Sequence, residues 1–171
     1  MKEPELIQLR AFGDDRGRFW ESFNQSIQER TGEVFVQDNF ATSSKNVVRG
    51  LHFQNPPYAQ AKLVSVLKGK VKDVVVDIRK ESANYGKVYE FELTGDRFEC
   101  LFVPVGFAHG YASLEDDTLF HYKCSNFYHP ESEGAILFND PELGIDWEVS
   151  NPIVSEKDQN ASLFNEFNSL F

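Results

Sequence analysis

The sequence has few cysteines and no long apolar run. Among its 171 residues there are two cysteines, Cys100 and Cys124, too few for a fold held together by disulfides. No stretch approaches the roughly 18 consecutive apolar residues of a transmembrane helix, and residues 1–4 do not resemble the start of a signal peptide. We therefore expect a cytoplasmic protein with reduced thiols, and the length suits one domain over residues 1–171.

Positive charge is also scarce. The chain has 17 Lys and Arg against 27 Asp and Glu, which gives a formal net charge of −10 and a pI of about 4.8. Proteins that bind nucleic acid or anionic membranes usually present a basic face, so no nucleic-acid or membrane partner is expected. An anionic small molecule would need the few basic residues to be gathered locally.

A metal-binding pattern is incomplete. The chain has four histidines, and His109 ends a Pro-x-Gly-x-x-His turn that is similar to the second half of the metal-cupin motif. The His-x-His pair of that motif occurs nowhere in the sequence. Iron and zinc sites use about three or four protein ligands, so the turn favours the fold without the metal. We expect neither a metal nor another cofactor.

The residues that are present favour β-structure. Phe is abundant, with 16 copies, and short apolar segments recur at spacings of about ten residues between Gly, Asn and Pro, which is typical of an all-β sandwich or barrel. A short helix is expected near residues 24–30 and a terminal helix over residues 155–171. The predicted strands are residues 6–12, 62–67, 71–79, 87–93, 99–103, 110–114 and 119–125.

Strand alternation assigns side chains to faces. In the last predicted strand, Phe120, Tyr122 and Cys124 share one face, and His121 lies on the other. Asp73 and Asp77 share a face of a Val-rich strand, where each carboxylate is either solvated or holds a histidine tautomer. The sequence does not decide between these two roles.

One histidine has polar and basic residues close to it in the sequence. His52 lies three residues after Arg49 and two before Gln54, and Lys62 opens the next predicted strand. An imidazole, an amide and basic groups together suit a polar anionic ligand better than a core. His121 and His129 are interpreted as structural.

Taken in order, these segments identify a family resemblance. The matching stretches are DRGRFWESF at 15–23, QDN at 37–39, VRGLHFQ at 48–54, QAKLV at 60–64, KDVVVDIR at 72–79, PVGFAHG at 104–110, YK at 122–123, NDP at 139–141 and SEKD at 155–158. The chain resembles dTDP-4-dehydrorhamnose 3,5-epimerase and related nucleotide-sugar epimerases. The resemblance implies an all-β, cupin-like jelly-roll barrel with short peripheral helices, a metal-free site, a homodimer and a dTDP-linked 4-keto-6-deoxy sugar as substrate.

The resemblance also implies residue roles. His52 matches the base that removes the proton next to the ketone, Asp158 the carboxylate that orients it, Tyr122 the acid on the opposite face, and Lys62 the cation near the C4 oxygen. Tyr128 matches the aromatic that stacks on thymine. The other matches to the sugar-nucleotide site are Arg16, Glu21, Gln37, Asn39, Arg49, His109, Glu133 and Lys157.

Departures from the family pattern leave the substrate open. Phe53 stands where Tyr is more usual, Phe138 where Trp is common, and Glu148 where Pro is common. None of these removes a catalytic group. The alternatives are a 3- or 5-epimerase acting at one carbon, a ketoisomerase of a related nucleotide sugar, and a sugar-binding or structural cupin without catalysis.

Overall fold

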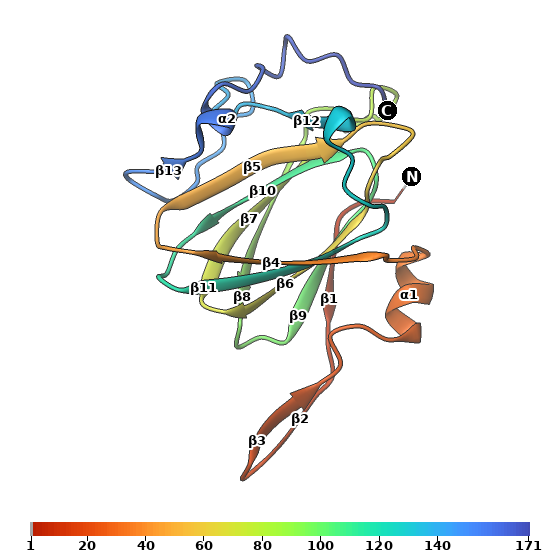
Figure 1. Cartoon of the computed structure of the whole chain (residues 1–171), viewed down its shortest axis with the longest axis vertical. Helices are drawn as coiled ribbons and strands as arrows, with labels where there is room; N and C mark the ends of the chain where they lie inside the picture. Colours follow the sequence, from red (N-terminus) through yellow and green to blue (C-terminus); the bar gives the residue numbers. More distant parts are fainter. Residues whose placement is uncertain (1) are drawn as a thin grey trace.

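A computed structural model describes residues 2–171 and contains mostly β-strands (Figure 1). The strands are β1 (Glu5–Gln8), β2 (Ala11–Asp14), β3 (Gly17–Trp20), β4 (Gln37–Ser43), β5 (Val47–Gln54), β6 (Lys62–Lys68), β7 (Lys70–Asp77), β8 (Val88–Thr94), β9 (Glu99–Val103), β10 (Phe107–Ser113), β11 (Thr118–Cys124), β12 (Glu133–Ala135) and β13 (Ile153–Val154). The helices are α1 (Gln25–Thr31), the 3-10 turn η1 (Pro130–Ser132) and α2 (Glu156–Gln159).

Two sheets face each other. One has the order β1-β9-β6-β11-β4 and the other β12-β5-β10-β7-β8, with β13 added to β5. Every pairing is antiparallel except that of β13 with β5. Since neighbours in each sheet are mostly distant in sequence, the chain crosses repeatedly between the sheets, as in a jelly roll. The predicted all-β architecture is confirmed.

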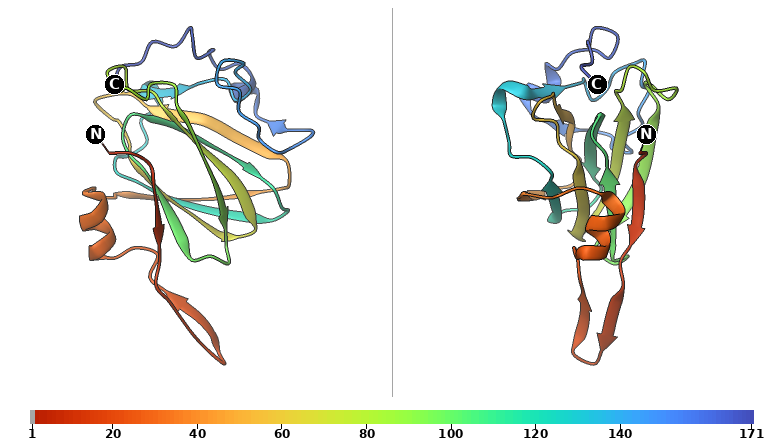
Figure 2. Two further views of the ribbon diagram at one scale, coloured as in Figure 1. Left: turned by 180° about the vertical axis from the view of Figure 1, so that it is seen from behind. Right: turned by 90° about the vertical axis from the view of Figure 1, so that its right-hand side faces the viewer.

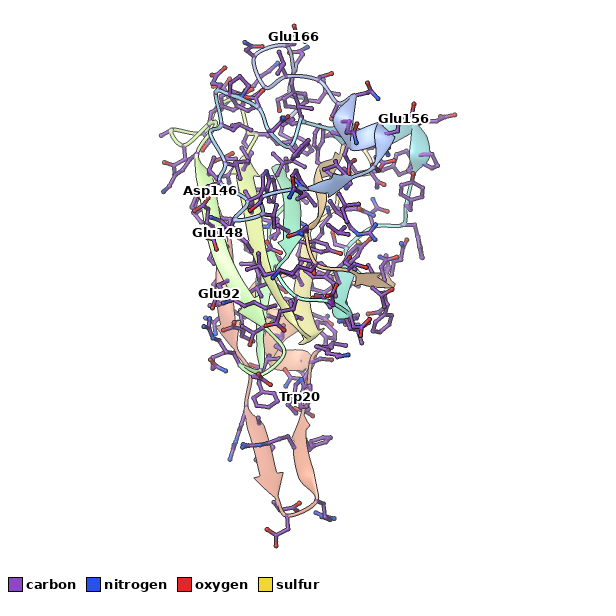
Figure 3. All side chains as sticks on the ribbon, turned by 90° about the vertical axis from the view of Figure 1, so that its left-hand side faces the viewer. Trp20, Glu92, Asp146, Glu148, Glu156 and Glu166 are labelled. Carbon is purple, nitrogen blue, oxygen red and sulfur yellow. The ribbon has the colours of Figure 1, made fainter. Side chains whose placement is uncertain are left out.

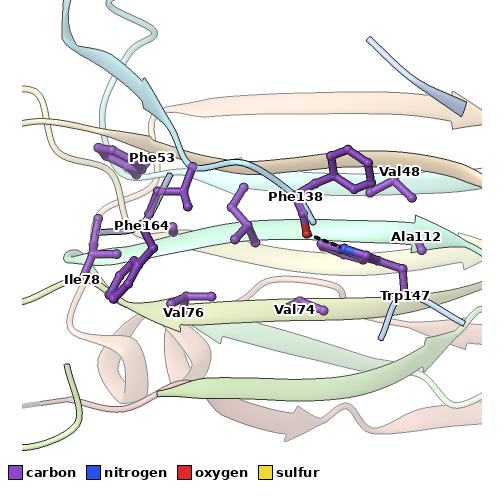
Figure 4. Packing of buried hydrophobic residues seen from close by; sticks show 12 residues of the cluster. Val48, Phe53, Val74, Val76, Ile78, Ala112, Phe138, Trp147 and Phe164 are labelled. Atoms are coloured by element: carbon purple, nitrogen blue, oxygen red, sulfur yellow. Dashed lines mark hydrogen bonds between the residues drawn. The ribbon is translucent and has the colours of Figure 1, made fainter. Parts of the chain in front are cut away.

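The β7 strand is buried on both faces, and its alternation divides the core. Val71 and Val75 join an apolar cluster between the sheets, together with Phe120 from β11. Val74 and Val76 face outward into a second cluster (Figure 4). That outer cluster is covered by the chain after β12, where Trp147 Nε1 donates a hydrogen bond of 2.7 Å to the Phe138 carbonyl. The two-fold period predicted for this strand is therefore confirmed.

The N-terminal segment differs from the prediction. The strand expected over residues 6–12 is divided into β1, which joins the main sheet, and β2, which pairs with β3 as a separate hairpin. The hairpin projects beyond the body of the molecule (Figure 2), with Trp20 at its base against Phe98 (Figure 3). The predicted short helix is confirmed as α1, capped by the Asn24 side chain at its start and by Gly32 at its end.

The terminal helix predicted over residues 155–171 is wrong beyond its first turn. Only α2 is a helix. Further along, a single turn forms where the Phe167 amide donates to the Leu163 carbonyl at 3.0 Å, and the backbone groups on either side of it bind other elements. The Phe164 amide donates to Asp140 Oδ2 at 2.7 Å, and the Phe171 carbonyl accepts from the Lys80 amide at 3.0 Å. Phe164 and Phe167 still pack on the outer cluster, so their helix-like spacing reflects burial without a helix.

Candidate active site

A cavity of about 550 Å³ opens between the two sheets. Its wall includes side chains from β4, β6 and β11 of one sheet, from β5 and β10 of the other, and from β12, β13 and α2. This volume falls in the usual range of small-molecule sites, about 300–1,000 Å³. Apart from two residues described below, all predicted site residues line it: Gln37, Asn39, Arg49, His52, Lys62, His109, Tyr122, Tyr128, Glu133, Lys157 and Asp158.

A β-bulge in β5 brings Arg49 and His52 to the same wall. His52 pairs with His109 and Arg49 with Tyr111, so two residues of β5, Gly50 and Leu51, oppose one residue of β10. The strands approach closely at this point. A Cβ on Gly50 would lie 2.5 Å from the Gly110 Cα, and Gly50 has a φ of +125° that disfavours other residues.

His52 forms a dyad with Asp158. The His52 Nε2 atom lies 2.6 Å from Asp158 Oδ1, and Asp158 Oδ2 accepts the Gly50 amide at 3.3 Å. Burial would raise the pKa of Asp158, but hydrogen bonds from His52 and Gly50 outweigh it and hold the pKa below the ordinary value. A carboxylate that accepts Nε2–H leaves the lone pair of a neutral imidazole on Nδ1. The dyad can therefore accept a proton at Nδ1.

A second imidazole–carboxylate pair lies deeper in the cavity. His109 Nε2 is 2.9 Å from both carboxylate oxygens of Asp73, which is fully buried on β7. Burial raises the pKa of Asp73, against the opposing influence of His109 and Lys62. The structure thus resolves the alternative for Asp73, which holds an imidazole. For Asp77 neither predicted role is right, because its buried carboxylate binds Arg79 at 2.6 Å. Strand alternation places Asp73 opposite Val74, but it does not identify the imidazole that Asp73 holds.

Lys62 lies close to both pairs. Its Nζ donates to the His52 carbonyl at 3.3 Å. Burial lowers the pKa of Lys62, while the charges of Cys124, Asp73 and Glu133 act in the opposite direction. Among residues 2–171 no carboxylate lies within ion-pair distance of this half-buried ammonium group, so it is available for an oxygen that becomes negative in the cavity.

Tyr122 faces the same cavity from the opposite sheet. Phe120, Tyr122 and Cys124 line the cavity, whereas His121 and its neighbour Lys123 bind Asp38 on the other face, as alternation predicts. Burial raises the pKa of the Tyr122 phenol, so its hydroxyl stays protonated at neutral pH. On β4, the residue paired with Tyr122 is Asn39, whose Oδ1 accepts from Gln37 Nε2 at 2.9 Å.

Three residues join across the cavity mouth. Glu133 Oε2 accepts the Tyr128 hydroxyl at 2.7 Å and lies 2.6 Å from Lys157 Nζ on α2. Burial raises the pKa of Glu133, but its bonds with Lys157 and Tyr128 bring it below the ordinary value. The Tyr128 ring is exposed, with 54% of the residue accessible. It offers an aromatic face at the entrance.

Two predicted site residues lie elsewhere. Arg16 is at the tip of the β2–β3 hairpin, paired with Asp14 at 2.5 Å, and Glu21 accepts a hydrogen bond from Asn24 at 2.9 Å. Neither residue lines the cavity of its own chain. The prediction that they line the site is therefore wrong for a single chain, because the hairpin projects away from the cavity walls (Figure 1).

The part of the chain that the structure describes lacks both a metal-ligand cluster and a membrane-spanning helix. Within residues 2–171, no group of three or more His, Cys, Asp or Glu side chains is arranged to hold a metal ion. No helix in this range is long and apolar enough to span a bilayer.

The family model described as dTDP-4-dehydrorhamnose 3,5-epimerase matches residues 1–166. The chain belongs to this family. The dTDP-4-dehydrorhamnose 3,5-epimerase of Escherichia coli strain K12 is 48% identical over 165 residues, which cover 94% of this chain and 89% of the relative.

Solved structures agree with this assignment. The dTDP-4-dehydrorhamnose 3,5-epimerase from Elizabethkingia anophelis matches with a TM-score of 0.90 and 48% identity, covering 96% of this chain and 93% of that chain. The dTDP-6-deoxy-D-glucose-3,5-epimerase from Legionella pneumophila, in complex with dTDP-4-keto-L-rhamnose, matches with a TM-score of 0.91 and 43% identity, covering 96% and 89%. The predicted family, cupin-like jelly-roll fold and enzyme class, an epimerase, are confirmed.

Proposed function

We propose that this epimerase inverts C3 and C5 of a dTDP-linked 4-keto-6-deoxyhexose, in the pathway to dTDP-rhamnose. The observation that carries the proposal is the placement of His52 and Tyr122 on facing sheets of one cavity that Lys62 also lines. Inversion of a carbon requires a base on one face and an acid on the other, and two facing walls can supply them.

In this mechanism His52 removes the proton next to the C4 ketone. Asp158 holds the imidazole so that Nδ1 is the basic atom, and it stabilises the imidazolium that forms. General acid–base catalysis contributes roughly 10²–10⁴-fold, whereas enzymes lower barriers by about 8–23 kcal/mol in all. The base therefore needs electrostatic help.

The ammonium group of Lys62 provides this electrostatic stabilisation. Lys62 stabilises the enolate oxygen at C4, and the His109–Asp73 pair adds a second polar group deep in the cavity. Preorganised charge in a water-poor site is usually the largest single contribution to catalysis. Tyr122 then delivers a proton to the opposite face, so the configuration of the carbon inverts.

The remaining residues hold the nucleotide. Tyr128 stacks on the base, and Lys157 and Arg49 supply positive charge for the diphosphate in an otherwise acidic protein. Without ligand, Lys157 forms an ion pair with Glu133, and the ligand replaces this partner when it binds. Gln37, Asn39 and His109 contribute hydrogen bonds to the sugar nucleotide.

A homodimer reconciles the hairpin with the site. The projecting hairpin exposes Phe12 and Phe19, which suits burial against a second copy. In such a dimer Arg16 and Glu21 reach the partner's cavity. The enzyme is assigned to the cytoplasm, where it supplies a deoxysugar for carbohydrate biosynthesis, including that of lipopolysaccharide.

The test follows deuterium uptake by NMR. The purified protein is incubated in D₂O with dTDP-4-keto-6-deoxyglucose, the 4-keto-6-deoxy sugar nucleotide. We expect deuterium at both C3 and C5 together with the inverted product. Uptake at one carbon would limit the enzyme to a single epimerisation, and uptake at neither would refute the proposed function.

A further inference from the structure

Besides Tyr122 and Tyr128, the cavity wall contains a third tyrosine, Tyr111, that the proposed mechanism does not use. It lies on β10 two residues after His109, and only 4% of it is exposed. Its ring stacks on Phe120, with centroids 4.0 Å apart and 14° between the planes. Packing alone would require only the ring, so the hydroxyl needs a separate explanation.

The Tyr111 hydroxyl joins the two sheets through Ser43. Its oxygen lies 3.1 Å from Ser43 Oγ on β4, which is also buried. Ser43 Oγ accepts a second hydrogen bond from Arg49 Nε on β5, at 3.3 Å, and Arg49 Nη2 donates to the Thr42 carbonyl at 3.4 Å. Either hydroxyl can be the donor between Tyr111 and Ser43, and in both cases the Ser43 oxygen has a lone pair that accepts from Arg49. Burial raises the pKa of Tyr111, which keeps its proton available for this bond.

Among residues 2–171, hydrogen bonds to Ser43 and Thr42 hold the Arg49 side chain, and no ion pair does. No carboxylate lies within ion-pair distance of it among residues 2–171, and the residue is exposed. A long side chain with many rotamers loses entropy when a ligand fixes it, so an arginine held in place beforehand binds more tightly. The bonds to Ser43 and Thr42 provide that constraint.

We propose that Tyr111 is a positioning residue that, through Ser43, holds the Arg49 guanidinium at the cavity wall for the anionic nucleotide sugar. This inference rests on the proposed function, in which Arg49 contacts the substrate. It assigns Tyr111 to binding and leaves proton delivery to Tyr122. The role is distinct from packing because the hydroxyl carries it and the ring does not.

The test compares Tyr111→Phe with the wild-type enzyme, using dTDP-4-keto-6-deoxyglucose. We expect KM to rise roughly tenfold, on the scale of a lost hydrogen bond in a network with a charged group, while kcat changes by less than about twofold. Ser43→Ala should raise KM to a similar extent. Ser43→Thr keeps a hydroxyl, so its KM should stay close to that of the wild type. Tyr89→Phe is the matched control, since it removes a hydrogen-bonded tyrosine hydroxyl outside the cavity, and its KM should not change.

A double variant isolates the dependence on Arg49. In an Arg49→Ala background, Tyr111→Phe should change kcat/KM by less than about twofold, because the group it positions is gone. An unchanged KM in Tyr111→Phe and Ser43→Ala would overturn the inference. So would a collapse of kcat with loss of inversion, since Tyr111 would then be a proton donor. If the wild-type enzyme does not turn over this substrate, the proposed function fails instead.

Discussion

His52 and Asp158 are separated by 106 residues in the chain, and their side chains meet at 2.6 Å. The contact depends on the C-terminal part of the fold. There β13 pairs with β5, and Ser155 caps the short helix α2 that carries Asp158. His52 and the carboxylate that holds it therefore come from segments far apart in the chain, and the dyad forms only when the last segment has docked.

Replacing the base should abolish activity. His52→Ala is expected to lose both turnover and deuterium exchange while keeping the wild-type circular dichroism spectrum, because water is a poor substitute for a positioned imidazole. His121→Ala is the control, since His121 lies on the other face of β11. Exchange at the wild-type rate in His52→Ala would show that another group is the base.

Tyr122→Phe should separate exchange from inversion. The substitution keeps the ring and removes only the hydroxyl. His52, held by Asp158, can still remove the proton, and Lys62 can still stabilise the enolate. Deuterium should enter on the original face, whereas inverted product should fall by roughly two orders of magnitude or more. NMR of the recovered substrate measures both quantities. An equal loss of exchange and inversion would mean that Tyr122 acts before proton removal.

The Asp158 carboxyl should make stability depend on pH in the acidic range. Its pKa in the folded state lies below the ordinary value of 3.8, because hydrogen bonds from His52 and Gly50 outweigh burial. The folded protein thus gains stability from the ionised form above the unfolded pKa and loses it as the pH falls through the folded pKa. In urea unfolding, the difference in stability between wild type and Asp158→Asn should therefore begin to shrink as the pH falls past about 4, near the unfolded pKa, and should disappear only below the lower folded pKa. A difference that does not change with pH would contradict this assignment.

Mixed subunits test the placement of Arg16. Arg16→Ala and His52→Ala should each be impaired as pure proteins. If the hairpin reaches the partner's cavity, unfolding and refolding the two together gives hybrid dimers with one intact site, which combines His52 from one chain and Arg16 from the other. Assayed activity above that of either variant alone is expected. No recovery in hybrids verified by mass spectrometry would exclude sharing of the site.

Chelation should leave activity unchanged. The part of the chain described by the structure offers no cluster of three or more metal-binding side chains, and the proposed enolate is stabilised by Lys62. Incubation with EDTA followed by gel filtration should return full turnover in the NMR assay. Activity that is lost and then restored by a particular divalent metal would contradict the proposed metal-free mechanism.

Most site residues could be predicted from the sequence only through the family resemblance, whereas strand alternation, which is local, assigned a few side chains to faces. Alternation correctly separated Tyr122 from His121 and placed Asp73 opposite Val74, without deciding whether the Asp73 carboxylate is solvated or holds an imidazole. Contacts between distant segments were not accessible in this way. The hydrogen bond that ties Phe164 to Asp140 replaces the expected terminal helix, and the direction of the hairpin removes Arg16 from its own cavity. These outcomes depend on tertiary partners that no periodicity encodes.

The bulge at Gly50 reverses the parity of β5. Before it, odd-numbered residues such as Arg49 face the cavity; after it, even-numbered ones such as His52 do. The same reversal keeps both Val48 and Leu51 in the outer cluster, so cavity-facing and core-facing positions exchange parity at one glycine. A substitution that straightened the strand would displace half of its side chains to the wrong face at once, leaving no partly functional intermediate between the two registers.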